Sequence, residues 1–128
     1  MLSSRRRVLA RLRALFTRRR GVRVRVFYNQ SPAFSAYRHA DPVRLIVTVR
    51  LAIDAGVPDD EVDRVVLERV FAACNGHPLR PGDRVDARLP RAMSVGDLAA
   101  VADRWYACDP VGWRPVPAPR RARVPRRG

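Results

Sequence analysis

The chain has 128 residues, 47% of them hydrophobic, which suffices for one domain with a modest core. Its apolar runs reach only about five residues, as at residues 45–49 if Thr48 is counted, far short of the ~20 residues of a membrane-spanning helix, so we expect no integral membrane association. The basic start is followed by only three apolar residues before Arg11, not by the sustained apolar region of a signal peptide. Two cysteines without a denser framework are typical of a reducing compartment. The sequence therefore predicts a cytoplasmic protein.

The formal net charge of +14 is concentrated at the two ends of the chain. Residues 1–20 contain eight arginines and residues 119–128 contain five, with no acid in either segment. Residues 21–118 therefore carry only +1, and we expect the folded domain to have little field of its own. All 26 basic residues are arginine, which we attribute to coding bias in a GC-rich genome, although the charge itself favours a polyanion such as DNA or RNA. The candidate contact residues are the tail arginines: Arg5, Arg6, Arg7, Arg11, Arg13, Arg18, Arg19, Arg20, Arg120, Arg121, Arg123, Arg126 and Arg127.

Residues 1–20 are predicted to form a short basic amphipathic helix that ends at Gly21. The apolar positions at helical spacing are Val8, Leu9, Leu12, Leu15 and Phe16. A helix this short is marginal alone in water. Three interpretations are open: the segment binds nucleic acid, it lies on an anionic membrane surface, or it precedes the true start of the protein. In each case we expect it to be an extension outside a folded domain of residues 21–116.

Two strands and one helix are predicted in the first part of this domain. Residues 22–28 alternate valine with arginine, which indicates a half-buried strand, and residues 43–53 form a second strand rich in Val, Ile and Leu. The helix is expected at residues 59–74. Acids at residues 59–61 occupy its first turn, where the helix dipole favours anions, and Asn75-Gly76 supplies its C-terminal cap.

A β-meander is predicted after a proline- and arginine-rich connector at residues 79–92. Its three strands are expected at residues 95–101, 105–108 and 113–116. Residues 117–128 are too polar to pack a core and are expected to be a disordered tail. The predicted fold is a small single α+β domain of order β-β-α-β-β-β with a C-terminal β-meander, flanked by basic tails.

A zinc site is the first chemistry to weigh, because Cys74 and His77 have the spacing of half such a site. Cys108 and His39 are the remaining candidate ligands. Cys74, however, falls on the apolar face of the predicted helix, and Cys108 lies inside an aromatic strand. Both are interpreted as small core residues, and no metal or other cofactor is expected.

Acidic and aromatic residues are explained without an active site. The acids at residues 59–61 suit a helix start, and Asp97 and Asp103 are interpreted as turn residues. Trp105 and Tyr106 lie among arginines, as in the stacking platforms of single-strand binders. Strand alternation sends these two side chains to opposite faces, so we favour cross-strand aromatic packing. We therefore expect the protein not to be an enzyme.

The motifs of the meander point to a family. They are Met93-Ser-Val-Gly-Asp97, Val101, Tyr106-Ala-Cys108 and Gly112-Trp113. Together with residues 28–38 and 71–78, they resemble the YodL-like domain, a small family carried by conjugative and integrative mobile elements, and in particular its relatives from high-GC Gram-positive bacteria. The resemblance covers about residues 22–116. The chain departs from it at Ala99-Ala100, where relatives carry β-branched residues, and at residues 102–104, which lack the usual Asp-Gly turn.

No enzymatic role attaches to this family, so the resemblance implies a context rather than a mechanism. We expect a non-catalytic accessory protein of a mobile element that contacts DNA or RNA through its tails, weakly and without sequence preference. The alternative is a protein–protein interaction module with solubilising tails. A metal-dependent or cysteine enzyme ranks last.

Overall fold

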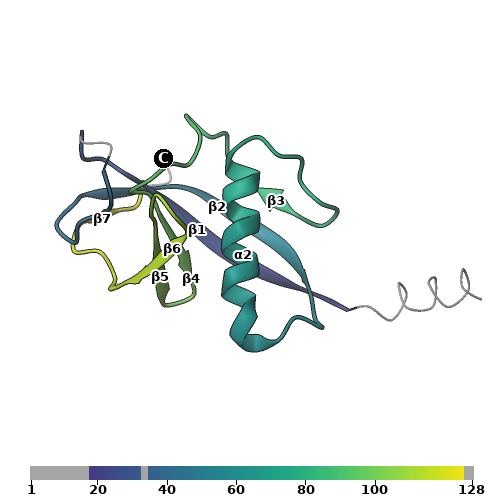
Figure 1. Ribbon diagram of the computed structural model, residues 1–128. Coiled ribbons are helices and arrows are strands. Elements are labelled where there is room, and N and C mark those ends of the chain that lie inside the picture. Colours follow the sequence, from purple (N-terminus) through teal and green to yellow (C-terminus); the bar gives the residue numbers. More distant parts are fainter. Residues whose placement is uncertain (1–17, 33–34, 126–128) are drawn as a thin grey trace, which may run out of the picture.

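The computed structural model describes residues 18–32 and 35–125, which form one mixed sheet with a helix packed across one face (Figure 1). The elements are β1 (Arg19–Asn29), β2 (Val43–Asp54), α2 (Asp59–Cys74), β3 (Arg84–Val85), β4 (Leu98–Val101), β5 (Arg104–Cys108), β6 (Trp113–Val116) and β7 (Ala122–Arg123). The strand order is β3-β2-β1-β4-β5-β6, and β7 pairs with β2. All neighbours are antiparallel except β2 and β7. The predicted α+β class, the helix and the C-terminal meander are confirmed.

Two short strands and one boundary differ from the prediction. β3 lies in the expected connector, and β7 lies in the expected disordered tail, so the prediction of disorder is wrong for Ala122 and Arg123. The reason is that the edge of β2 supplies backbone partners: the Val43 N–H donates to the Arg121 carbonyl at 2.9 Å. Gly21 does not end a helix at this point, because it lies inside β1 opposite Ala52.

A β-bulge divides β2 between the two faces of the sheet. Its odd-numbered residues are all apolar, which alternation alone would place on a single face. Val26 pairs with Val47, but the next residue, Phe27, pairs with Leu45. The extra residue, Ile46, reverses the phase of the strand. The part of β2 after the bulge therefore packs under α2, and the part before it packs on the opposite face.

The core consequently has two parts. The larger lies between the sheet and α2, and its buried residues are Val24, Val26, Tyr28, Val47, Val49, Leu51, Ile53, Val62, Val66, Leu67, Val70, Cys74, Met93, Ala99 and Val101. The smaller lies on the other side of the sheet and comprises Phe27, Tyr37, Val43, Leu98, Ala100 and Ala107. We call the side of the sheet opposite α2 the open face, because this smaller core occupies only the end of it near the start of β2. The rest of the open face carries arginines together with small and polar residues such as Gly21, Thr48 and Ala52.

Candidate functional site

Three arginines lie in register across three neighbouring strands of the open face. Arg23 of β1 pairs with Arg50 of β2, and Arg50 pairs in turn with Arg84 of β3. Their neighbours in sequence pack toward α2, so alternation directs the arginines to the other side. All three residues are exposed. Because neighbouring strands lie about 4.8 Å apart, the three backbone positions span only about 10 Å. We call these residues the arginine row.

The arginine row has no ion-pair partner within the part of the chain that the structure describes. Arg23, Arg50 and Arg84 form no ion pair there, whereas the arginines of α2 and of the meander do. Like charges that face each other across strands destabilise a sheet. The row therefore opposes folding slightly and leaves three guanidinium groups free to bind an anion.

The arginine row lines a shallow groove of about 640 Å³ together with Arg25, Thr48 and Asp86. Asp86 is the one carboxylate among the described residues that line it. That carboxylate accepts a hydrogen bond from the Thr48 backbone N–H at 2.8 Å, which holds it against the edge of β2. The groove thus combines four guanidinium groups with one acid that is already engaged.

Arg25 connects this groove to the aromatic residues of the open face. Its guanidinium carbon lies 5.2 Å from the centre of the Trp105 ring and 5.6 Å from that of Phe27. The two rings pack at a centroid distance of 4.9 Å with an interplanar angle of 48°. Trp105 and Tyr106 do point to opposite faces, as predicted, because Tyr106 packs against the core under α2. Trp105 is half-buried, which confirms cross-strand packing.

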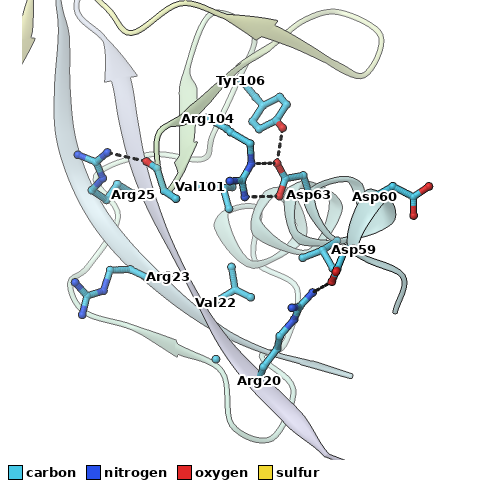
Figure 2. A pocket seen from close by; sticks show the side chains of 13 residues that line it. Arg20, Val22, Arg23, Arg25, Asp59, Asp60, Asp63, Val101, Arg104 and Tyr106 are labelled. Atoms are coloured by element: carbon cyan, nitrogen blue, oxygen red, sulfur yellow. Dashed lines mark hydrogen bonds and ion pairs between the residues drawn. The ribbon is translucent and has the colours of Figure 1, made fainter. Parts of the chain in front are cut away.

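The small net charge of residues 21–118 conceals a separation of charge between the two sides of the sheet. α2 carries five acids and two arginines, and it lies on the side opposite the arginine row. Figure 2 shows Arg23 and Arg25 pointing to one side of β1, with the acids of α2 on the other. The expectation that the domain has little field of its own is therefore corrected: its open face is locally basic although the sum is nearly neutral.

The tail arginines are not brought together into one site. Arg5, Arg6, Arg7, Arg11, Arg13, Arg126 and Arg127 lie outside the described residues. Arg19 and Arg20 belong to β1 near the end of β2, and Arg20 forms an ion pair with Asp59 at 3.4 Å. Arg121 and Arg123 lie beside the start of β2. Arg18 precedes β1, and Arg120 precedes β7. The described tail arginines thus occupy opposite ends of β2.

The two cysteines are core residues, as predicted. Cys74 and Cys108 are only 2% and 5% exposed, and burial raises the pKa of each thiol to about 11. His39 and His77 are exposed. Within residues 18–32 and 35–125, no group of three or more potential ligands is placed to hold a metal ion. The zinc hypothesis therefore has no geometric support in the described chain.

Asp97 has a larger structural role than the turn assigned to it. It is fully buried, and both oxygens of its carboxylate bind Arg91, at 2.7 and 2.9 Å. The backbone N–H groups of Asn29 and Ser94 donate to the same carboxylate, each at 2.9 Å. This network joins the start of the meander to β1. The only sequence feature that marks this position is the preceding residue, Gly96, which allows the backbone to take a φ of +94° before Asp97.

A second contact that sequence analysis missed joins the meander to α2. The Arg104 Nε and Nη2 atoms donate to the Asp63 carboxylate at 2.6 and 2.9 Å, and the Tyr106 hydroxyl donates to it as well. The Arg104 guanidinium holds the pKa of Asp63 below its ordinary value, and the Tyr106 hydrogen bond acts in the same direction. The spacing of these residues along the chain gave no sign of this contact.

No family model matches the chain, and neither a curated protein nor a solved structure matches it. The resemblance to YodL-like domains therefore stays a prediction that rests on its motifs. Among the described elements, no helix has the length and apolar character needed to cross a membrane.

Proposed function

We propose that the protein is a non-catalytic nucleic-acid-binding protein whose contact surface is the open face of its sheet. The observation that carries the proposal is the arginine row: three exposed, in-register guanidinium groups without an ion pair among the described residues. The proposal keeps the expected DNA or RNA partner but moves the main contact from the tails to the domain. In this role it is a cytoplasmic accessory protein of a mobile element, the context that the YodL-like resemblance implies.

A polyanion fits this surface for electrostatic reasons. Each guanidinium presents a planar fork of donors that matches two oxygens of a phosphate. A bound phosphate backbone would replace the repulsion within the arginine row by attraction, and it would release the counterions that surround a nucleic acid. Phosphate contacts position a protein without reading bases, so we expect binding without sequence preference. The arginines of the tails would add further phosphate contacts and raise the affinity.

The test compares two variants that lose three charges each at different places with a third variant that loses charge from the first tail. One variant replaces Arg23, Arg50 and Arg84 by Gln. The control variant replaces three other exposed arginines by Gln: Arg38, Arg64 and Arg88. A third variant replaces five of the eight arginines of the first tail by Gln, namely Arg5, Arg6, Arg7, Arg11 and Arg13. Fluorescence anisotropy with labelled random duplex and single-stranded oligonucleotides, across a salt series, gives affinity and salt dependence for each.

We expect the variant of the arginine row to bind at least tenfold more weakly than the control variant at low salt. Its slope of log affinity against log salt should fall by about 2–3, since each lost phosphate contact lowers that slope by about 1. Equal losses in the row variant and the control variant would mean that only total charge matters and would refute the proposal. If the row variant binds as well as the wild-type protein and the tail variant does not bind, the tails make the main contact with nucleic acid and the proposal is wrong.

A further inference from the structure

β1 is longer than the strand on one of its sides. It pairs with β2 along its whole length, but β4 covers only residues 24–27. Beside residues 19–23, on the side of β4, no described strand is present. We call residues 19–23 the free edge.

Hydrogen bonds on the far side of β2 show which backbone groups of the free edge point outward. The backbone N–H groups of Thr48 and Ala52 donate to the carboxylates of Asp86 and Asp83, at 2.8 and 2.9 Å. Both acids come from the segment around β3, which lies on the side of β2 away from β1. Residues of an antiparallel strand alternate in the side to which they direct their backbone groups. The even-numbered residues of this part of β2 therefore turn their N–H and C=O groups away from β1.

Their partners in β1 turn the other way. Arg19, Gly21 and Arg23 lie opposite even-numbered residues of β2, so their backbone N–H and C=O groups are directed away from β2 as well. On that side Arg19 and Gly21 meet none of the described strands, and Arg23 lies next to the turn that follows β4. A row of donors and acceptors without a strand partner is a template for an additional strand.

The free edge borders a groove of about 810 Å³, whose other walls are the first two turns of α2 and the turn between β4 and β5 (Figure 2). Val22, Val62 and Val101 line its apolar part. Asp59 and Asp63 line it too, but they are paired with Arg20 and Arg104, at 3.4 and 2.6 Å.

The charged side chains that are not paired with each other at this groove indicate which residue types an added strand would have on each of its faces. Arg23 and Arg25 point to the open face in Figure 2, and Asp60 lines the groove at its rim on the side of α2. Successive side chains of a strand project to opposite faces. On the side of α2 they would meet valines, and on the open face they would meet arginines. A strand that alternates aliphatic and acidic residues is therefore complementary to the free edge.

A second copy of the chain is a poor occupant of this groove. Pairing two free edges would bring Arg19, Arg20 and Arg23 of one copy beside the same arginines of the other. Charged residues on an edge strand prevent self-pairing in this way.

We propose that the free edge binds an extended segment of a partner protein by β-strand addition, and that this segment alternates aliphatic and acidic residues. This site shares Arg23 and Arg25 with the groove of the arginine row, because the side chains of both arginines would face the acidic residues of the added strand. The backbone of residues 19–23 belongs to the free edge alone.

The experiment uses the full-length protein and a labelled seven-residue peptide that alternates Glu and Val, with a Lys and Val peptide for comparison. Gly21→Pro removes one outward N–H group from the free edge and leaves every charge in place. Gly21→Ala is the matched control, because it keeps the N–H and because a Cβ at Gly21 meets no atom within 4 Å. Fluorescence anisotropy measures the affinity, and circular dichroism checks that both variants fold.

We expect the wild-type protein and Gly21→Ala to bind the Glu and Val peptide equally, and Gly21→Pro to bind it at least tenfold more weakly. The Lys and Val peptide should also bind at least tenfold more weakly. Equal binding by Gly21→Pro would show that charge alone attracts the peptide and would overturn the proposal, as would no binding by the wild-type protein. If Gly21→Pro does not fold, amide exchange in the wild-type protein decides: the peptide must slow exchange at Arg19, Gly21 and Arg23, and unchanged rates overturn the proposal.

Discussion

Replacing the central residue of the arginine row is expected to stabilise the folded domain. Arg50 has a like charge directly opposite on each side, Arg23 on β1 and Arg84 on β3. Arg50→Gln removes this charge but keeps a flexible polar side chain of similar length. No described ion pair is lost with it, so the change isolates the repulsion within the row.

The expected size of the effect follows from the spacing of neighbouring strands, about 4.8 Å, which puts paired side-chain charges on the order of 6 Å apart. Two unit charges about 6 Å apart repel by roughly 0.7 kcal/mol in water before screening. Arg50 has two such neighbours, so the repulsion amounts to ~1.4 kcal/mol. At 10 mM salt the Debye length is about 30 Å, so screening is weak and ~1 kcal/mol of this repulsion remains. At 1 M salt the Debye length is about 3 Å, so most of the repulsion is screened.

Urea unfolding at 10 mM and 1 M salt measures this difference, since urea adds no ions of its own. We expect Arg50→Gln to unfold with a free energy ~1 kcal/mol above that of the wild-type protein at low salt and nearly equal to it at high salt. Arg64→Gln is the control, because Arg64 pairs with Glu61 and Glu68 and its loss should destabilise slightly. An Arg50→Gln variant that is no more stable than the wild type at low salt would refute the reasoning.

Three further predictions concern the fold. Gly96→Ala should lower the free energy of unfolding in urea by about 3 kcal/mol, because φ is +94° and a Cβ would lie 2.6 Å from the Ser35 carbonyl oxygen; a loss below ~1 kcal/mol would contradict this. Ala102→Gly should raise it by about 0.5–1 kcal/mol, since Ala102 has a φ of +54°, and a loss of stability would exclude strain at this turn. The folded-state pKa of Asp63 is lowered by Arg104, so this contact stabilises above the unfolded pKa of about 3.9 and is lost as pH falls through the folded pKa. The difference between wild-type protein and Asp63→Asn in urea unfolding should therefore be constant above pH ~5 and shrink below pH ~4, whereas a constant difference down to pH ~2 would show that this carboxylate does not act through its charge.

The sequence by itself determined the elements whose signals are local. α2 runs from Asp59 to Cys74 as predicted, because the acids of its first turn and Asn75-Gly76 at its end mark both boundaries within a few residues of the chain. The alternating pattern of β1 and the aromatic strands of the meander were recognisable for the same reason. The burial of both cysteines followed from their positions on apolar faces.

Only the tertiary structure decided where the charges meet. Arg23, Arg50 and Arg84 are far apart in sequence, and only the pairing of three strands places them side by side. A sum of charges over the domain contains no information about which face each charge occupies, so the near-neutral total hid a basic surface. The bulge at Ile46 and the free edge of β1 likewise depend on strand register and on the unequal lengths of neighbouring strands. Register arises from contacts between distant segments, which is why no local pattern could reveal the candidate site.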